Sequence, residues 1–213
     1  MDTSVIIVSA GSSTRMQGQN KQLALVCGIP VAARSMMAFE KCESVAEIIV
    51  VTRTEDIETM QQLAEQYRIT KLSCVVPGGN TRQESVLNGV RKISDDTKMI
   101  AVHDGARPLV TPENIERTIA DARIFSGAVI GVLVKDTIKT VSDGLITDTP
   151  PRSSLYITQT PQVFKRSVYL RAVEFASRNH LDFTDDSDVI HAPRGNQHGL
   201  GCTRTTNTKN TNK

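Results

Sequence analysis

The sequence has little of what nucleic-acid-binding and membrane proteins need. It carries 25 lysines and arginines against 23 acidic residues, so its net charge of +2 leaves no strong cationic excess to attract a polyanion. No apolar run approaches the length of a membrane span. The chain also lacks a charged leader followed by a long apolar stretch, because the short run Val5 to Val8 begins almost at once. We therefore expect a cytoplasmic protein that binds neither nucleic acid nor a membrane.

Cysteine pairs and the commonest glycine-rich nucleotide motifs are absent as well. The four cysteines stand far apart with no C-x-x-C pair, which argues against a zinc site or a redox motif and favours reduced thiols. The sequence contains neither the Walker pattern G-x-x-x-x-G-K-[ST] nor the dinucleotide fingerprint G-x-G-x-x-G. The second absence counts against a dehydrogenase, the generic alternative for an alternating α/β chain.

What the sequence does contain is a regular alternation of two kinds of apolar segment. The first kind is short and rich in β-branched residues, as buried parallel strands are. These runs are Val5 to Val8, Glu47 to Val51, Leu72 to Val76, Met99 to Val102 and Ala128 to Leu133. The second kind has helical spacing or a helix-opening cap. These segments are Ala32 to Phe39, Ile57 to Tyr67, Arg82 to Ile93, the segment opened by Thr111-Pro112, and Arg166 to Arg178.

This order of segments predicts the fold class and the place of a ligand. At 213 residues the chain is long enough for one sizeable core, and we expect a single domain. Alternating strands and helices predict an α/β fold with a mostly parallel sheet and helices on both faces. In such folds the ligand binds outside the carboxyl ends of the strands. The loops after Val8, Val76 and Val102 are therefore the candidate binding loops.

Two segments depart from the alternation. Within residues 137–160, short polar and apolar runs flank Ser142-Asp143-Gly144, and Asp-Gly is a strong hairpin signal. Because a projecting hairpin is marginally stable alone, we expect this β-arm to pack on a second subunit in a homodimer. In residues 193–213, Leu200 and Cys202 are the only apolar side chains after Pro193 and acidic residues are absent. We therefore expect the domain to span residues 1–192 and the rest to be a disordered tail.

The loop after the first strand carries the clearest chemical signal. It reads Ser9-Ala10-Gly11-Ser12-Ser13-Thr14-Arg15-Met16 and continues to Asn20-Lys21-Gln22. Small residues let the backbone approach a phosphate chain while amides and hydroxyls donate to its oxygens, and the cations Arg15 and Lys21 neutralise its charge. A solvated Ser/Gly connection is the alternative. The position after the first strand and the two cations favour phosphate binding.

This loop is the first of six blocks that occur in a fixed order. The other five are Gly78-Gly79-Asn80-Thr81-Arg82-Gln83-Glu84-Ser85-Val86, His103-Asp104-Gly105-Ala106-Arg107-Pro108, Asp136-Thr137-Ile138-Lys139, Thr160-Pro161-Gln162 and Thr184-Asp185-Asp186. Together they span roughly Val5 to Ala192 and resemble the motifs of the 2-C-methyl-D-erythritol 4-phosphate cytidylyltransferases. The resemblance implies a Rossmann-like nucleotidyltransferase sheet, CTP and a polyol phosphate as substrates, and Mg²⁺ as cofactor.

The resemblance also implies roles for individual residues. Backbone groups near Ala10, Gly11 and Gly79, with Ser85, would recognise cytosine, and Asp104 and Gly105 would lie beside the ribose. Thr137 and Arg152 of one subunit would hold the methylerythritol phosphate of the other. The complete set of expected substrate-binding residues is Ser9, Ala10, Gly11, Gly79, Ser85, Asp104, Gly105, Arg107, Thr137 and Arg152.

The implied reaction needs fixed cations rather than a general base. The acceptor phosphate is already an anion and would attack the α-phosphorus of CTP in line, expelling pyrophosphate. Charge develops on the equatorial oxygens, so Arg15 and Lys21 are the expected catalytic residues. Mg²⁺ is usually held by substrate phosphates and one or two carboxylates, and Asp104 is the expected metal ligand. His103 is given no proton-transfer role.

Several alternatives stay open. Ribitol 5-phosphate cytidylyltransferases are similar, but their first loop tends to carry a double glycine and Pro-Lys-Gln, where this chain has Asn20-Lys21-Gln22. Family members also continue past the Thr-Asp-Asp helix with an Asn-Ile-Lys-Ile-Thr segment that this chain lacks, so a CTP-binding protein with impaired catalysis is a further possibility. Asp104 and Arg107 could form only an ion pair at a strand end. Asp185-Asp186 favours a helix cap over a metal site.

Overall fold

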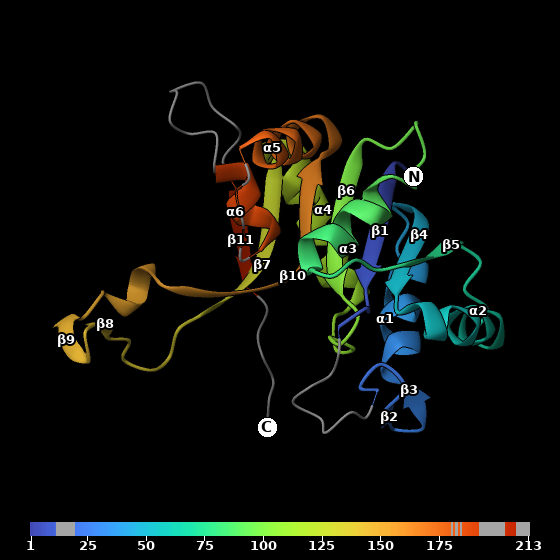
Figure 1. Cartoon of the computed structure of the whole chain (residues 1–213), viewed down its shortest axis with the longest axis horizontal. Coiled ribbons are helices and arrows are strands. Elements are labelled where there is room, and N and C mark those ends of the chain that lie inside the picture. Colours follow the sequence, from blue (N-terminus) through green and yellow to red (C-terminus); the bar gives the residue numbers. More distant parts are fainter. Residues whose placement is uncertain (12–19, 180, 182, 184, 192–202, 208–213) are drawn as a thin grey trace.

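The computed structural model of the chain describes residues 1–11, 20–179, 181, 183, 185–191 and 203–207. Its centre is a seven-stranded sheet in the order β11-β7-β10-β6-β1-β4-β5 (Figure 1). The strands are β1 (Thr3–Val8), β4 (Val45–Thr52), β5 (Leu72–Pro77), β6 (Met99–Asp104), β7 (Gly127–Leu133), β10 (Tyr156–Lys165) and β11 (Thr203–Asn207). Of these, β10 runs antiparallel to both β6 and β7, and the other pairs are parallel. The mostly parallel sheet expected from the sequence is confirmed.

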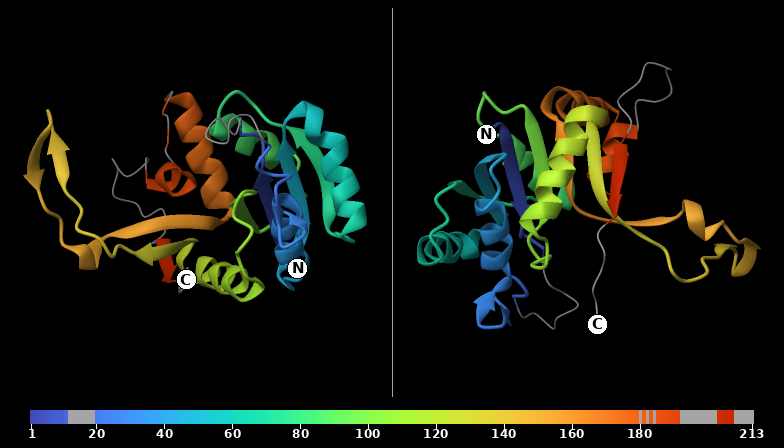
Figure 2. Two further views of the ribbon diagram at one scale, coloured as in Figure 1. Left: turned by 90° about the horizontal axis from the view of Figure 1, so that it is seen from below. Right: turned by 180° about the vertical axis from the view of Figure 1, so that it is seen from behind.

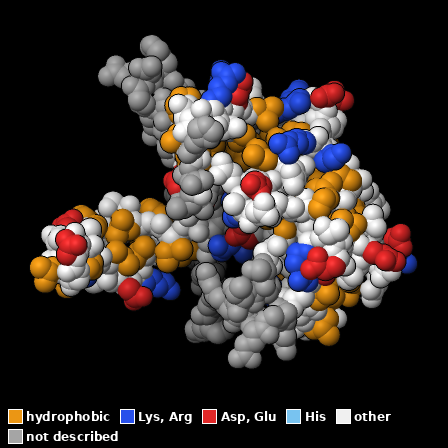
Figure 3. Space-filling view, in the orientation of Figure 1, with side chains coloured by type: hydrophobic (Ala, Val, Ile, Leu, Met, Phe, Trp, Pro, Cys, Tyr) orange, Lys and Arg blue, Asp and Glu red, His pale blue; other side chains and the backbone are white. Residues whose placement is uncertain are grey.

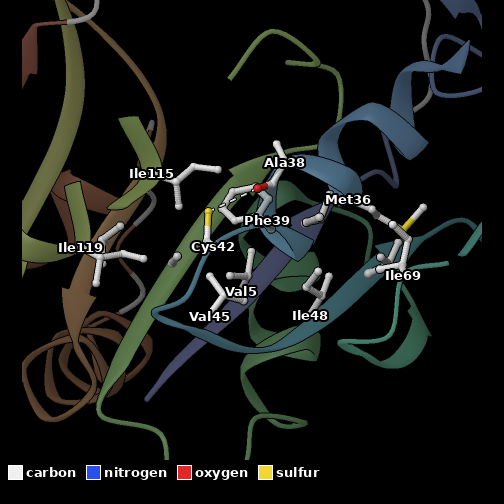
Figure 4. Close-up of a cluster of buried hydrophobic side chains, with 14 of the residues drawn as sticks. Val5, Met36, Ala38, Phe39, Cys42, Val45, Ile48, Ile69, Ile115 and Ile119 are labelled. Atoms are coloured by element: carbon white, nitrogen blue, oxygen red, sulfur yellow. Dashed lines mark hydrogen bonds between the residues drawn. The ribbon is translucent and has the colours of Figure 1, made fainter. Parts of the chain in front are cut away.

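Helices cover both faces of this sheet, as expected. They are α1 (Val31–Glu40), α2 (Ile57–Gln66), α3 (Arg82–Val90), α4 (Pro112–Phe125), α5 (Arg166–Arg178) and α6 (Asp186–His191). Apolar residues of α1, α2 and α4 share one buried cluster with Val5, Ile48 and Val50 (Figure 4). Residues of α3, α5 and α6 share a second cluster with Ile6 and Ile49. Successive strand residues point to opposite faces, so each central strand needs an almost continuous apolar run to serve both clusters.

The arm is present and stands away from the sheet (Figures 1 and 2). Its hairpin consists of β8 (Thr140–Ser142) and β9 (Leu145–Asp148), joined by Asp143 and Gly144 at φ 51° and 79°. Two consecutive positive φ angles define the tight turn that Asp-Gly favours. A 3₁₀ turn, η3 (Arg152–Ser154), leads back to β10. Leu145 and Ile146 on the arm are 72% and 65% exposed, so apolar surface lies among its charged side chains (Figure 3).

Three smaller elements complete the described structure. Strands β2 (Leu25–Val26) and β3 (Ile29–Pro30) form a short hairpin before α1, and the 3₁₀ turn η2 (Thr54–Asp56) precedes α2. The hairpin turn, Cys27 and Gly28, also has positive φ angles. Among the residues that the structure describes, no helix has the length and apolar character that crossing a membrane requires.

Two strands of the seven-stranded sheet were not predicted from the sequence, and neither were the short strands β2 and β3. Strand β10 contains Pro161, which cannot donate to a β-ladder, and its pairing with β7 shifts register between Thr158 and Gln162. Strand β11 lies within the expected tail and pairs in parallel with β7 from Thr203 to Asn207. Three of its five residues are threonine, a β-branched residue that suits a strand, and β7 offers it an edge to pair with. The remainder of the tail, 193–202 and 208–213, lies outside the described residues.

Candidate active site

A cleft of about 830 Å³ opens at the carboxyl ends of β1, β5 and β6, where the fold class predicts a ligand. Seven of the expected site residues line it: Ala10, Gly11, Lys21, Gly79, Ser85, Asp104 and Arg107. Ser9 and Gly105 lie directly behind this wall. Arg15 is outside the described residues. Thr137 and Arg152 are on the arm and do not line the cleft of their own chain.

The first loop and the end of β6 approach each other very closely. The amide of Ser9 donates to the carbonyl of Val51 at 2.6 Å, and the amide of Gly105 donates to the carbonyl of Val8 at 2.9 Å. A Cβ atom on Gly105 would lie 2.1 Å from Oγ of Ser9 and 3.0 Å from Oε1 of Gln22. Both oxygens are buried and have no hydrogen-bond partner among the residues that the structure describes. Only a residue without a side chain therefore fits at position 105, where the end of β6 packs against the first loop.

The Gly78-Gly79 turn is fixed by the beginning of α3. The hydroxyl of Ser85 donates to the carbonyl of Thr81 at 2.9 Å and accepts from the amide of Gly79 at 3.0 Å. Thr81 caps the helix by accepting from the amide of Glu84. The Glu84 carboxylate in turn accepts from the amide of Asn80 at 2.6 Å. These bonds hold the loop in one shape before any nucleotide arrives, which lowers the entropic cost of binding.

Substitution of Gly78 by alanine is expected to disturb this wall. A Cβ atom there would lie 2.3 Å from Cβ of Ala10 and 2.9 Å from Oγ of Ser85, so the first loop or α3 must move. We expect the affinity for CTP to fall by on the order of 10-fold or more, because small displacements of positioning groups have large effects. Calorimetric titration with CTP measures this. Unchanged affinity in a protein with an unchanged melting temperature would show that the two walls separate easily.

Asp104 is held between two arginines at the end of β6. Its Oδ2 lies 3.0 Å from Nε of Arg107, and its Oδ1 lies 3.4 Å from an Nη atom of Arg82. Burial raises the pKa of this carboxyl group, but the hydrogen bond from Arg107 and the charges of Arg82 and Arg107 outweigh it and lower the pKa below its ordinary value. Asp104 is therefore ionised at neutral pH and fixed in direction. The ion pair that the sequence left as an alternative exists, and it lies in the wall of the cleft.

His103 lies one residue earlier and faces the other way. Its ring is fully buried and packs edge-on against Phe39, with the ring centroids 5.0 Å apart. Burial lowers its pKa to about 4, so the imidazole is neutral. Its Nδ1 lies 3.0 Å from Oγ1 of Thr160, which also accepts the amide of Asp104 at 3.0 Å. His103 thus supports the backbone of the site from behind and has no access to a substrate.

Sequence reasoning left several cleft residues without a role. Thr158, Gln159, Thr160 and Gln162 come from β10, and the remaining lining residues are Val8, Gln22, Asn80, Thr81, Arg82, Ala106 and Asp185. Asp185 accepts hydrogen bonds from Gln162 at 2.9 Å and from the amide of Asp188 at 3.0 Å. The second bond caps α6, as the sequence favoured. Most of these residues belong to the six sequence blocks described above, so membership in a block was the signal that could have identified them as cleft residues.

The expected site residues of the arm are not among the residues that line the cleft. Arg152 donates to the carbonyl of Lys135 at 2.9 Å, and Lys139 donates to the hydroxyl of Thr149 at 2.8 Å. Thr137 is exposed on the same arm. These contacts are made within the arm and at its base, and the arm projects away from the sheet in both figures (Figures 1 and 2).

A magnesium ion would have to be held largely by its substrate. Among the described residues, no cluster of three His, Cys, Asp or Glu side chains could hold a metal. The Asp104 side chain is 33% exposed, and each of its oxygens faces a single arginine. A carboxylate offers about four lone-pair positions, so Asp104 keeps acceptor capacity for one further cation. The residues present therefore fit Mg²⁺ bound through one carboxylate together with phosphate oxygens.

Comparisons with known proteins agree with the cleft and its motifs. A sequence model of the family described as 2-C-methyl-D-erythritol 4-phosphate cytidylyltransferase matches residues 3–213. The curated relative of that name from Caldanaerobacter subterraneus subsp. tengcongensis is 42% identical over 193 residues, covering 89% of this chain and 85% of the relative. One from Clostridium botulinum is 39% identical over 189 residues, covering 88% of this chain and 82% of the relative.

Solved structures show the same relationship. The 4-diphosphocytidyl-2C-methyl-D-erythritol synthase from Anaerococcus prevotii has a TM-score of 0.84 and 26% identity, covering 96% of this chain and 86% of its own. The 2-C-methyl-D-erythritol 4-phosphate cytidylyltransferase from Thermus thermophilus has a TM-score of 0.75 and 25% identity, covering 99% and 90%. With the expected motifs gathered on one cleft and this likeness extending over most of its length, the chain belongs to the 2-C-methyl-D-erythritol 4-phosphate cytidylyltransferase family of nucleotidyltransferases.

Proposed function

We propose that this chain transfers the cytidylyl group of CTP to 2-C-methyl-D-erythritol 4-phosphate and releases pyrophosphate, a step in the synthesis of isoprenoid precursors. The observation that carries the proposal is one cleft that brings Ala10, Gly11, Gly79 and Ser85 together with the cations Lys21 and Arg107 and the carboxylate of Asp104. A base, a ribose and a phosphate chain need these three kinds of surface side by side. We place the activity in the cytoplasm, where CTP is available.

The division of labour follows from the chemistry of the walls. The Gly79 loop presents backbone groups held by Ser85, which suits the edge of a cytosine. Asp104 is ionised and fixed, which suits hydrogen bonding to ribose hydroxyls. Lys21 lies over Gly11, since a Cβ atom there would be 4.0 Å from its Nζ, and the first loop carries Arg15 as well. These two cations would neutralise the charge that develops as the acceptor phosphate attacks the α-phosphorus.

Mg²⁺ belongs to the same proposal, with Asp104 as its protein ligand. When bound, the ion would supply positive charge next to the phosphate oxygens on which negative charge increases during the reaction. Asp104 can contribute one oxygen while Arg82 and Arg107 keep the carboxylate in place. The acceptor is an anion at neutral pH, so none of the site residues has to remove a proton from it.

We further propose a homodimer in which the arm of each subunit completes the cleft of the other. The support is that Thr137 and Arg152 lie away from their own cleft and that the arm exposes Leu145 and Ile146. Apolar surface on a two-stranded projection is stable only when another surface covers it. Thr137 and Arg152 would then bind the phosphate and hydroxyl groups of the acceptor.

Complementation between two variants tests this arrangement. Lys21→Gln removes a cation of the cleft and Arg152→Ala removes one of the arm, so each variant alone is expected to be nearly inactive. When the two are co-expressed and assemble at random, about one quarter of the sites combine an intact cleft with an intact arm, so activity should recover to about a quarter of the parent value. No recovery, in mixtures shown to contain mixed dimers, would mean that the arm serves its own cleft or none.

The function itself is tested by pyrophosphate release from CTP and Mg²⁺ with two acceptors in parallel. Turnover with methylerythritol phosphate but not with ribitol 5-phosphate is the expected result. Turnover with ribitol 5-phosphate alone would replace the acceptor and keep the reaction class. CTP binding with no turnover on either acceptor would identify a nucleotide-binding protein whose altered C-terminal segment has impaired its catalysis.

A further inference from the structure

A buried carboxylate outside the cleft is tied to the cleft through a single arginine. Arg82, the first residue of α3, lies between two acidic side chains. One Nη atom lies 3.4 Å from Oδ1 of Asp104, and the other lies 2.8 Å from Oδ2 of Asp186. Asp104 lines the cleft, whereas Asp186 lines a small cavity of about 50 Å³ behind it. The planar guanidinium therefore connects the site to the beginning of α6.

Asp186 is itself fixed by a second buried group. Its side chain is 5% exposed, and its Oδ1 accepts a hydrogen bond from the hydroxyl of Tyr169 at 2.6 Å. The Tyr169 ring is 1% exposed and stacks on Phe164, with the ring centroids 5.3 Å apart. A carboxylate held in this way cannot rotate to a different partner, and a charge buried to this degree requires a cation. Among the ion pairs of the described residues, Arg82 is the cation that Asp186 contacts.

The position of Arg82 makes these carboxylates necessary. The first turn of a helix carries partial positive charge, so a cation there is unfavourable. Arg82 nevertheless lies at that point, only 36% exposed, and attraction to Asp186 and Asp104 is what holds it. Without Asp186, the guanidinium would lose its shorter ion pair and be free to turn toward solvent.

We propose that Asp186 is a positioning residue of the cytidylyltransferase site, which holds Arg82 in the orientation that fixes the Asp104 carboxylate. Asp186 does not touch substrate. Asp186 lies on α6, is held there by Tyr169 of α5, and acts on Asp104 through Arg82. Arg107 fixes the other Asp104 oxygen independently. The proposal rests on the function proposed above only for its kinetic readout, since the same chain of contacts predicts an effect on CTP binding.

A double-mutant cycle between Asp186→Asn and Arg82→Gln tests it. Asn keeps the volume of the side chain but removes the charge that Arg82 contacts. We expect Asp186→Asn alone to lower kcat/KM and to weaken CTP binding, each by on the order of 10-fold. In the Arg82→Gln background the same change should have almost no further effect, because the contact it acts through is gone. A purely structural role would lower the melting temperature but leave the kinetics of the folded enzyme unchanged.

Asp188→Asn is the matched control, because it removes the same charge from an exposed position on the same helix. It should leave kcat/KM and CTP affinity unchanged. If Asp186→Asn does not fold, Tyr169→Phe replaces it, since this change removes only the hydroxyl that fixes Asp186. It should cause a smaller loss of the same kind, again absent in the Arg82→Gln background. Equal losses in both backgrounds, or no loss in either, overturn the proposal.

Failure of the inference and failure of the proposed function are separable. If the parent chain binds CTP but does not turn over, the function fails, and the cycle is completed on dissociation constants for CTP alone. If the parent turns over and the cycle shows no coupling, the inference fails and the function stands.

Discussion

Replacement of Lys21 by glutamine is expected to lower kcat by roughly 10²-fold to 10³-fold, while the affinity for CTP changes much less. Lys21 lines the cleft beside the first loop, where the phosphate chain of a nucleotide would lie. The charge on the equatorial oxygens grows as the acceptor attacks, so a fixed cation contributes more to the transition state than to the bound substrate. Removal of one such group typically costs about 3–4 kcal/mol of transition-state stabilisation.

The measurement is the steady-state rate of pyrophosphate release, with CTP affinity determined separately by calorimetry. Lys92→Gln is the matched control, because it makes the same change at an exposed position near the end of α3, away from the residues that line the cleft. A large rise in KM with unchanged kcat would show that Lys21 binds substrate and transition state equally. Lys21 would then be a binding residue and lose its catalytic assignment.

The sheet and its helices could be predicted because their signal is local. Val5 to Val8 and Met99 to Val102 are nearly continuous apolar runs, which only strands covered on both faces require. The cap and proline at Thr111-Pro112 likewise mark the beginning of α4 by local chemistry. Such patterns also fix which loops meet at the carboxyl edge of the sheet. The place of the cleft followed from them without further information.

The strands that escaped prediction depend on partners far along the chain. Strand β10 contains Pro161 and several polar residues. It forms a strand because it pairs with β6 on one side and with β7 on the other. Strand β11 has a polar sequence, and the open edge of β7 is its only partner among the described strands. Neither condition is visible in a short window of sequence.

The candidate site shows the same division. Motif blocks identified most residues that line the cleft, because each block is a loop with its own backbone requirements. The connection from Asp104 through Arg82 to Asp186 was not foreseen, because it joins three elements separated in sequence. One signal was available: an arginine directly after the cap Thr81 opposes the charge of the helix terminus and therefore requires a nearby carboxylate.

The stability of the chain is expected to fall steeply as the pH drops from about 6.5 toward 4, because the folded chain keeps His103 buried and neutral. Burial lowers its pKa from 6.5 to about 4, so between these values the unfolded chain binds a proton that the folded chain does not. The free energy of unfolding therefore falls with each step of acidification and rises again as the pH rises. From pH 7.5 to pH 4.5 the loss attributable to this group is on the order of 2 to 3 kcal/mol.

The test is the free energy of unfolding in urea across this pH range, for the parent and for His103→Asn, without nucleotide. Asn can keep the contact with Thr160 that Nδ1 makes, although it loses the packing against Phe39. The variant should thus be less stable at pH 7.5 but should approach the parent as the pH falls. Asp104 and Asp185, whose pKa values the fold lowers, affect stability mainly at lower pH, and both remain in the variant. Parallel curves for the two proteins would mean that His103 accepts a proton in the folded state, so the buried ring would have to be charged or exposed.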